Sequence, residues 1–580
     1  MFIRLASGKT NKDKIVYLVE GYRDSTGKSK QRIIIKFGRL SELQKDNPNI
    51  LEELKFQYNN KDNDDDSIVY LPIDLSKSNN ISNPILNYGY FFLDAIYESL
   101  KLPSFISNCS RNKDFKYDLN KILKLLVFGR ILNPASKKET FETKEKYFNM
   151  NFDFSLDDVY RSLSHMESMK ERIQSWIHNQ VKESIGRDVS LVFYDVTNYY
   201  FETEIQDDDE YDEDNNLIDK GLRKKGVSKE HRPEPIVQMG MFIDNKGIPI
   251  AYKLFPGNTN DKATLLPILE EMKELYELGR IIVVADKGLN SGSNLLFIKS
   301  KGDGYVVAQQ IRKRKQEMID KVLNEDGYIY NESNTFKIKD WIEEKKVSDN
   351  DGHTHLLKEK VVCFWSKDFE DREKYKRGNL EDLIKKFQAK PSLYTASNSF
   401  GVKKYLKERN LDKETGEVKK KNPVLIFDEE KYKRDTQLDG YYMLVSSELN
   451  LSNAEIIEKY RGLWKIEESF RIIKSDLEGR PVYVHTKEHI EGHFLTCFIS
   501  LVIMRILQNK LECKYTAANI QKALNEATVQ LLDKEIYSVA KQNDVFKEIE
   551  TIYNADLDKA HAKLMTIKQY NKKIHNTLNQ

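Results

Sequence analysis

The sequence predicts an α/β fold with a mixed central β-sheet, and three stretches support this prediction. Ser190–Asn198 (SLVFYDVTN) and Ile281–Gly288 (IIVVADKG) contain short apolar runs, which are typical of central strands covered on both faces. These runs end at Asp195 and at Asp286. The third stretch, Ser452–Leu477, has the spacing of a helix that packs against a domain. In open α/β sheets functional side chains gather at the carboxyl ends of strands, so we expect both aspartates to belong to a site.

The predicted helix carries two charges on a face that should otherwise be apolar. Ser452 and Glu455 have the spacing of a capping box, which gives the helix its start. After this start, residues spaced alternately by four and three positions lie on one face of the helix: Ile456, Tyr460, Leu463, Glu467, Phe470, Lys474 and Leu477. A charge on a packed face is costly unless it is paired, binds a metal ion or faces a cleft. A surface ion pair between Glu467 and Arg471 is an alternative that the helix alone leaves open.

The order of elements between residues 189 and 310 indicates a ribonuclease-H-like core. A first strand is followed by a hairpin and then by alternating helices and strands. The strands are expected at Leu191–Val196, Ile236–Ile243, Ile250–Phe255, Ile281–Ala285 and Tyr305–Gln309, with the hairpin turn at Asp244–Gly247. This fold keeps its metal ligands on the first strand, the fourth strand and a late helix, which here carry Asp195, Asp286 and Glu467. Three carboxylates suit hard divalent cations, which need oxygen ligands.

The chain has 580 residues, more than one hydrophobic core accommodates, so we expect several regions. The interval between Asp286 and Glu467 is too long for one connection and indicates an inserted, mainly-β domain. The expected regions are a small basic β-rich module with a linker (1–67), a helical region that suits DNA binding or a structural bundle (68–188), the first part of the core (189–310), the insertion domain (311–436), the second part of the core with the Glu467 helix (437–510) and a helical C-terminal region (511–580).

The composition indicates a cytoplasmic protein and gives no partner by itself. Charged residues make up 32% of the chain and the net charge is only +2, so a nucleic-acid surface would need local segregation of charge. Four widely spaced cysteines argue against a zinc site or a disulfide framework and suit a reducing compartment. The start of the chain has no signal-peptide pattern, and Phe494–Met504 is too short to span a bilayer. We therefore expect no membrane partner.

The insert after the first strand separates acidic from basic residues. Asp207–Asp214 (DDDEYDED) is expected to be a solvated acidic loop. Asp219–Arg232 is basic and includes Lys229 and Arg232. A basic loop beside a carboxylate cluster is what a polyanionic substrate needs.

Four segments together resemble the insertion-sequence DDE transposases. They are YDVTNYYFE, GVSKEHRPEPIVQMGMFIDNKGIPIAYKLFPGNTND, IIVVADKGL and YRGLWKIEESFRIIKSDLEGRPVYV. Within that family the chain is similar to the group with a Tyr-Arg-Glu-Lys motif and a β-rich insertion before the glutamate. Tyr460, Glu467 and Lys474 occupy motif positions, whereas Leu463 stands where the arginine is expected. Arg461 or Lys465 could substitute for that arginine.

The resemblance implies a mechanism and partners. Asp195, Asp286 and Glu467 would hold two Mg²⁺ or Mn²⁺ ions for in-line displacement at phosphorus. The substrate would be double-stranded DNA, namely transposon ends and target, bound by a homodimer in a synaptic complex. The chain would then be nucleoid-associated when bound to DNA. Tyr460, Lys474, Lys229, Arg232, Arg461 and Lys465 are the expected DNA contacts.

Two other functions remain open from the sequence. Asp195-Val196-Thr197 after a strand has the arrangement of the nucleophile loop of haloacid-dehalogenase-like phosphatases, which form an aspartyl-phosphate. This interpretation gives Glu467 no role. A catalytically inactive, transposase-derived DNA-binding protein would normally have lost one of the carboxylates, and all three are present.

Overall fold

The computed structural model describes residues 2–7, 13–23, 29–59, 83–111, 115–230, 232–276, 278–349, 352–393, 401–409, 424–533 and 535–578. The chain forms two compact units, Met1–Ser82 and Asn83–Gln580.

The first unit is a small β-rich module. A three-stranded antiparallel sheet has the order β1-β2-β3, formed by β1 (Phe2–Ser7), β2 (Lys14–Arg23) and β3 (Ser29–Arg39). Two helices follow, α1 (Leu40–Asp46) and α2 (Ile50–Asn59), and Leu54 of α2 packs on Ile3, Val16 and Leu18 of the sheet. The β-rich module expected within residues 1–67 is therefore present. Residues 60–67, which belong to the linker expected in that range, lie outside the described residues.

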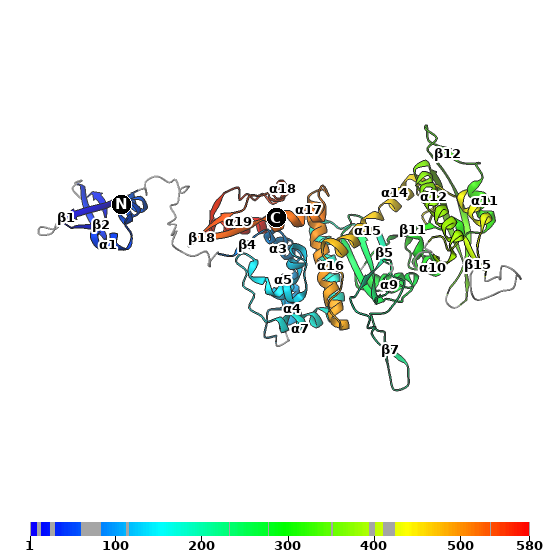
Figure 1. The fold of residues 1–580 in the computed structure, drawn as a ribbon, viewed down its shortest axis with the longest axis horizontal. Helices are drawn as coiled ribbons and strands as arrows, with labels where there is room; N and C mark the ends of the chain where they lie inside the picture. Colours follow the sequence, from blue (N-terminus) through cyan, green and yellow to red (C-terminus); the bar gives the residue numbers. More distant parts are fainter. Residues whose placement is uncertain are drawn as a thin grey trace. The chain divides into compact units, whose positions relative to one another are not determined.

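The second unit is organised around one nine-stranded mixed sheet (Figure 1). Its ribonuclease-H-like half has the order β9-β8-β5-β10-β11. The strands are β5 (Leu191–Tyr200), β8 (Ile236–Asp244), β9 (Pro249–Pro256), β10 (Ile282–Ala285) and β11 (Gly304–Gln309), with helices α9 (Leu265–Leu275) and α10 (Gly292–Ser300) between them in sequence. β5, β10 and β11 run parallel, and β8 pairs with β5 antiparallel. This order confirms the predicted fold class.

The inserted segment continues the same sheet. β14 pairs with β17, and β17 pairs with β11 of the core. The segment contains α11 (Gln316–Leu323), β12 (Ile329–Tyr330), β13 (Phe336–Ser348), β14 (Thr354–Ser366), α12 (Lys367–Ala389), β15 (Leu406–Arg409), β16 (Val424–Phe427) and α13 (Glu429–Thr436), and β17 (Tyr441–Ser446) follows it. Beyond the sheet, α12 and the β15–β16 hairpin enclose a small core of their own that includes Ile384, Tyr405 and Leu425.

The helical region before the core and the C-terminal region form one body around α16 (Lys487–Lys510). β4 (Ile85–Asn87) pairs with β18 (Thr528–Asp533), which closes a four-stranded sheet with β19 (Ile536–Val539) and β20 (His561–Lys563). The helices of this body are α3 (Tyr90–Ser99), α4 (Leu102–Ser110), α5 (Leu119–Leu132), α6 (Lys137–Glu142), α7 (Leu156–Glu167), α8 (Lys170–Ile185), α17 (Ala517–Glu526), α18 (Asp544–Ile552) and α19 (Leu564–Leu578). We expected 68–188 and 511–580 to be separate regions, but their described parts, from residue 83 and up to residue 578, form one body.

The apolar stretch at Phe494–Met504 belongs to a longer helix than expected. α16 has 24 residues, so among the described residues it is the helix whose length and composition would suffice to cross a membrane. The whole apolar window of α16 is buried inside the structure.

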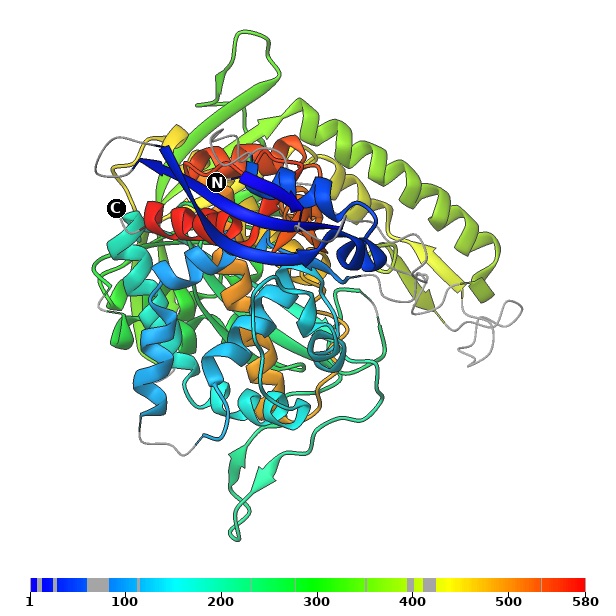
Figure 2. The ribbon, with the colours of Figure 1, turned by 90° about the vertical axis from the view of Figure 1, so that its left-hand side faces the viewer.

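The acidic insert after β5 projects from the second unit in both ribbon views (Figures 1 and 2). It forms a short hairpin of β6 (Glu210–Tyr211) and β7 (Leu217–Asp219). Its strands are mostly exposed, in agreement with the expected solvated loop.

Candidate active site

Asp195 and Asp286 lie side by side on neighbouring parallel strands. Ala285 at the end of β10 is paired with Tyr194 of β5, and each aspartate is the next residue along its strand. Because neighbouring strands lie about 4.8 Å apart, this register brings the two backbones together at the same level of the sheet. Both residues are partly exposed.

Glu467 lies on a helix that packs against β5, although the predicted single helix is broken into pieces. The capping box is present: the Ser452 hydroxyl accepts from the Glu455 backbone N–H at 3.2 Å. The chain then forms α14 (Asn453–Arg461), a turn at Gly462–Leu463, α15 (Trp464–Arg471) and a π-helical turn (Ile472–Asp476). Glu467 is exposed on α15.

Gly462 explains how the broken helix approaches the sheet. A Cβ added at Gly462 would overlap the ring of Phe193, two residues before Asp195 on β5. The absence of a side chain therefore lets the turn sit directly on the strand that carries Asp195. Periodicity alone did not reveal this break, because its cause is a contact with a distant strand.

The three carboxylates repel one another. The pKa of Asp195 is raised to about 6, mainly by burial and to a smaller extent by the charges of Asp286 and Glu467, against the lowering effect of Lys229. Such mutual repulsion, with oxygen donors only, fits a divalent cation, which would relieve it. Among the described residues, no three His, Cys, Asp or Glu side chains are already grouped closely enough to hold a metal ion. The chemistry of the three side chains, all oxygen donors, nevertheless fits a divalent metal ion.

A chain of hydrogen bonds through two tyrosines ends on Asp286, and only one of the two, Tyr460, was a predicted site residue. The Tyr460 hydroxyl donates to Asp286 Oδ1 at 3.2 Å and lies 2.9 Å from the Tyr442 hydroxyl. Since Tyr460 has one proton, Tyr442 donates to Tyr460, and the chain of hydrogen bonds ends on the carboxylate. Burial raises the pKa of Tyr460 above its ordinary value, which keeps this donor protonated. Tyr442 lies on the apolar strand β17, and no sequence pattern marked it.

Lys474, an expected DNA contact, is paired with a carboxylate of the protein itself. Its Nζ lies 3.0 Å from Glu230 Oε1, and the side chain of Lys474 is only 11% exposed. Arg480 binds the same oxygen of Glu230. Glu230 comes from the basic insert after β5, and its second oxygen is buried without a hydrogen-bond partner among the described residues.

Lys229 and Arg232, two further candidate DNA contacts, each have a partner within the protein. Lys229 donates to the backbone carbonyl of Val196, next to Asp195. The Arg232 guanidinium lies over the ring of Tyr200, 4.1 Å from its centre.

The structure separates the two proposed substitutes for the missing arginine. Lys465 donates to the carbonyl of Asn245, which lies beyond the Val192 end of β5, away from Asp195. Lys465 therefore does not face the carboxylates, which corrects that candidate. Arg461 at the end of α14 is exposed, and no side-chain partner is found for it in the described parts of the chain.

A cleft of about 600 Å³ opens beside the end of β5. Val196–Asn198, Lys229 and Gly288 are among its lining residues, so it adjoins both aspartates along the chain. Part of its wall is backbone, because Gly226 approaches Gly257 too closely for a side chain. A backbone-lined cleft beside carboxylates and a lysine can admit an extended polymer close to the site.

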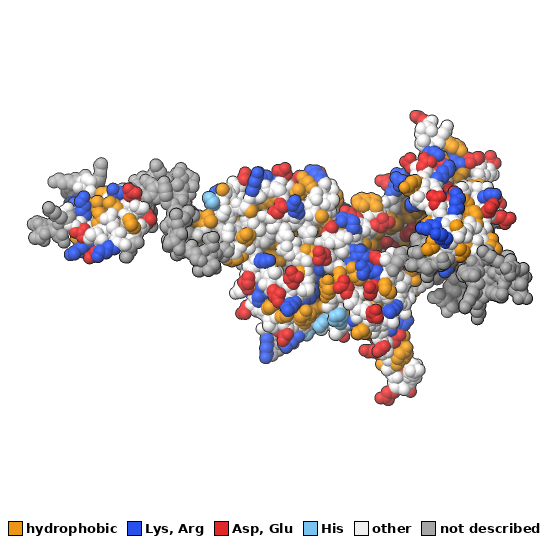
Figure 3. Space-filling view, in the orientation of Figure 1, with side chains coloured by type: hydrophobic (Ala, Val, Ile, Leu, Met, Phe, Trp, Pro, Cys, Tyr) orange, Lys and Arg blue, Asp and Glu red, His pale blue; other side chains and the backbone are white. Residues whose placement is uncertain are grey.

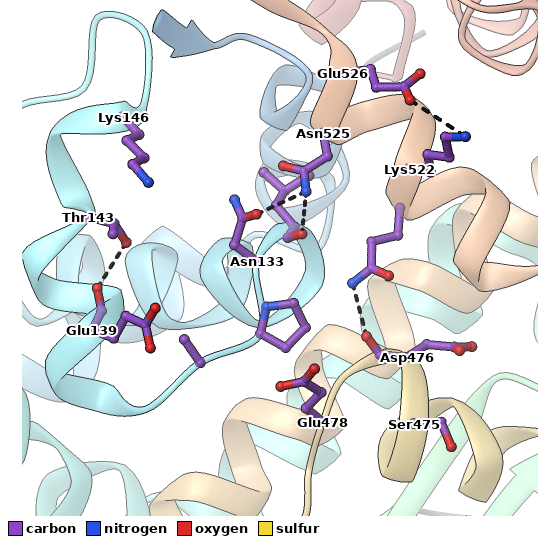
Figure 4. A pocket seen from close by; sticks show the side chains of 14 residues that line it. Asn133, Glu139, Thr143, Lys146, Ser475, Asp476, Glu478, Lys522, Asn525 and Glu526 are labelled. Atoms are coloured by element: carbon purple, nitrogen blue, oxygen red, sulfur yellow. Dashed lines mark hydrogen bonds and ion pairs between the residues drawn. The ribbon is translucent and has the colours of Figure 1, made fainter. Parts of the chain in front are cut away.

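A second, larger pocket of about 800 Å³ lies at the junction of α5, α6, the π-helical turn and α17 (Figure 4). Its charged lining residues are Glu139, Lys146, Asp476, Glu478, Lys522 and Glu526. Asn525 is directed to the carbonyl of Leu132 at 2.9 Å and so ties α17 to α5. With four carboxylates against two lysines, this pocket is a poorer site for phosphate groups than the cleft at β5.

Two family models match the chain. Residues 221–503 match the transposase DDE domain, and residues 5–64 match the N-terminal domain of IS1634 family transposases. The chain is an insertion-sequence DDE transposase. It is therefore an enzyme that cleaves DNA and transfers strands, and DDE transposases use a divalent metal ion. The phosphatase alternative is thereby wrong.

Comparisons with individual proteins add distant likenesses. No curated protein matches the chain. A piggyBac transposase synaptic complex with hairpin DNA is 8% identical over 76% of this chain and 78% of that chain, with a TM-score of 0.33. A Mos1 transposase paired-end complex with the left transposon end is 14% identical over 34% of this chain and 59% of that chain, with a TM-score of 0.14. With likenesses this low, the assignment of this transposase rests on the two family models.

Proposed function

We propose that this transposase binds the terminal inverted repeats of its insertion sequence, cleaves DNA at the element ends and transfers the 3′-hydroxyl strands to target DNA. Asp195, Asp286 and Glu467 are its catalytic carboxylates and metal ligands. The observation that supports this best is the register of β5 and β10, which sets the two aspartates side by side under the helix that carries Glu467.

The metal ions are two Mg²⁺ or Mn²⁺ ions, held by the three carboxylates. When bound, they supply activation of the attacking water or 3′-hydroxyl and stabilisation of the leaving oxygen. The protein's own contribution is to hold the ligands: Tyr442 and Tyr460 orient Asp286 by their hydrogen bonds. Lys229, bonded to the Val196 carbonyl, brings a positive charge beside Asp195.

The DNA backbone is bound along the cleft by Lys474, Lys229 and Arg232, with Arg461 in the role of the missing motif arginine. Lys474 must leave Glu230, or share it with Arg480, to reach a phosphate. Tyr460 serves the site through Asp286 rather than by a separate DNA contact. We further propose that two copies of the chain act together in the synaptic complex, and that the enzyme works in the cytoplasm on the nucleoid.

Conservative substitutions of the three carboxylates test the proposal. Asp195→Asn, Asp286→Asn and Glu467→Gln keep the side-chain shape and remove the charge that a metal needs, so each should abolish Mg²⁺-dependent cleavage of DNA containing the element ends. Binding of the same DNA should change little. Glu458→Gln, an exposed carboxylate on α14, is the matched control and should cleave normally. Cleavage at the wild-type rate in one of the three variants would remove that residue from the site, and no cleavage by the wild type would favour an inactive, DNA-binding descendant.

A further inference from the structure

A pocket of about 420 Å³ lies where the inserted segment meets the core, and we call it the seam pocket. It begins at Lys287, the residue after Asp286, and includes Tyr442, whose hydroxyl reaches Asp286 through Tyr460. The seam pocket therefore adjoins Asp286 through Lys287 and through the two tyrosines. Its other wall is formed by the inserted segment, through α13 and the turn at Ile311–Lys313.

The charge of the seam pocket is strongly positive. Six cationic side chains line it, namely Lys287, Arg312, Lys313, Lys404, Lys431 and Arg434, against two carboxylates. Both carboxylates have partners inside the protein: Glu373 binds Arg312 at 2.8 Å, and Asp435 accepts from the Tyr405 hydroxyl at 2.9 Å. In the space-filling view, Lys and Arg side chains gather where the inserted segment joins the core (Figure 3).

Four of these cations form no direct ion pair among the described residues. Lys287 and Lys313 are exposed, and among the described residues Arg434 has a hydrogen bond to the carbonyl of Arg312, at 3.4 Å. Lys431 is exposed as well and lies near Asp428, whose pKa is lowered mainly by Lys407 and to a smaller extent by the charge of Lys431. The four come from three separate places in the chain: the turn after β10, the turn at Ile311–Lys313 and α13. A spread of single charges along a seam suits an extended polyanion better than one small anion, which would need them to converge.

We propose that the seam pocket binds the phosphodiester backbone of the DNA strand next to the cleavage site. The proposal rests on the proposed function, because it takes Asp286 as part of the cleavage site, and it extends that function to the inserted segment. Tyr441 and Tyr442 line the same pocket, which adds aromatic surface to the positive charge. This combination is found where proteins track a nucleic-acid strand. The inserted segment thereby gains a role in holding substrate rather than only extending the sheet.

Lysine footprinting on the full-length wild-type protein tests where DNA lies. An acylating reagent is applied with and without a duplex of random sequence, and the modified lysines are identified by mass spectrometry. Lys313 and Lys431 should be protected by DNA. Lys385 and Lys386, which are exposed on α12 outside the seam pocket, should remain reactive. Equal reactivity of all four lysines with saturating DNA would overturn the proposal. Equal protection by inorganic pyrophosphate would also overturn it, because it would show a small-anion pocket.

The salt dependence of binding supplies a second, quantitative test. The double substitution Lys313→Gln/Lys431→Gln should reduce the slope of log K against log salt by about 1.8, from two phosphate contacts at about 0.9 each. The control Lys385→Gln/Lys386→Gln removes the same charge and should leave the slope unchanged. An equal loss in both doubles would mean that only overall charge matters, which contradicts a seam site.

Failure of this proposal is distinguishable from failure of the proposed function. If the wild type cleaves DNA, if Asp286→Asn does not, and if the seam double behaves as the control does, the carboxylate site stands and the seam site is wrong. If the seam lysines are protected but the wild type never cleaves, the DNA path stands and the catalytic assignment is wrong.

Discussion

At the scale of single residues, Glu230 competes with DNA for Lys474, so the contribution of Lys474 to DNA binding depends on Glu230. Glu230 draws Lys474 and Arg480 to one oxygen, so two cations that lie beside the cleft are engaged before DNA arrives. Its pKa is lowered because hydrogen bonds and charges from these partners outweigh the effect of burial, and it therefore stays ionised at neutral pH. A phosphate group would have to compete with this carboxylate.

Glu230→Gln should therefore strengthen DNA binding. Loss of the charge frees Lys474 and Arg480, and we expect affinity to rise roughly tenfold, which is about 1.4 kcal/mol. Salt titrations should give a steeper slope by about one unit, because the loss of one carboxylate leaves one more net positive charge that can neutralise a phosphate. Glu204→Gln, an exposed carboxylate in the same insert, is the control. If Glu230→Gln only lowers the melting temperature and leaves binding as it was, the ion pair is structural and Lys474 is not a DNA contact.

Lys137 gives a prediction for stability against pH. It is buried with its Nζ 3.3 Å from His493 Nδ1 and near Arg130, and burial lowers its pKa to about 7. The unfolded lysine has a pKa of about 10.4, so between pH 7 and 10 the unfolded chain binds more protons and stability rises with pH. Below pH 7 both states are protonated, and the full penalty of the buried charge is present. Lys137→Met should raise the unfolding free energy at pH 6 by roughly 1–4 kcal/mol. Urea denaturation of both proteins from pH 6 to 10 should show the difference shrinking with pH, and a constant difference would contradict this assignment.

At the scale of elements, the turn between α14 and α15 sets the distance from Glu467 to the aspartates. Gly462→Ala should push this turn away from Phe193, because the added Cβ would overlap the ring. Overpacking of this kind typically costs about 1–3 kcal/mol. We expect cleavage to fall far more than DNA binding, and Phe193→Leu in the same protein should restore part of the lost rate by making room. A Gly462→Ala protein that cleaves normally would show that this contact does not position α15.

The sequence predicted the elements whose cause is local. Strand burial and helix capping leave short-range patterns in the sequence. These patterns predicted the apolar runs of β5 and β10, each ended by an aspartate, and the capping box at Ser452. The break of the helix at Gly462 could not be predicted from the sequence, since its cause is a contact with Phe193 on another element. The same reason hid the Lys474–Glu230 pair, which joins residues from two separate parts of the chain. Hydrophobic periodicity does not predict which distant segments of the chain pack against each other, so it missed the features that depend on such packing.

At the scale of the whole molecule, the two ends of the second unit depend on each other. Asn87 of β4 is paired with Thr528 of β18, and the ring of Phe92 lies 5.1 Å from that of Tyr553 and 5.5 Å from that of Phe546. The helical region before the core therefore completes its hydrophobic core with residues from the C-terminal region. No sequence pattern reveals such a pairing, so 68–188 and 511–580 were expected as separate regions.

Truncated chains test this interdependence. A chain of residues 83–580 lacks only the first compact unit and should keep the circular dichroism and the cooperative thermal unfolding of the second. A chain of residues 83–510 loses β18, α18 and α19, which exposes Phe92 and its neighbours on α3 and removes the partner of β4. We expect this shorter chain to aggregate or to lose its cooperative transition, because a set of buried aromatic side chains would be left facing water. Adding the separate fragment 511–580 during refolding should recover part of the transition. If 83–510 unfolds as cooperatively and at the same temperature as 83–580, the C-terminal region is an accessory domain, and the body around α16 does not need it.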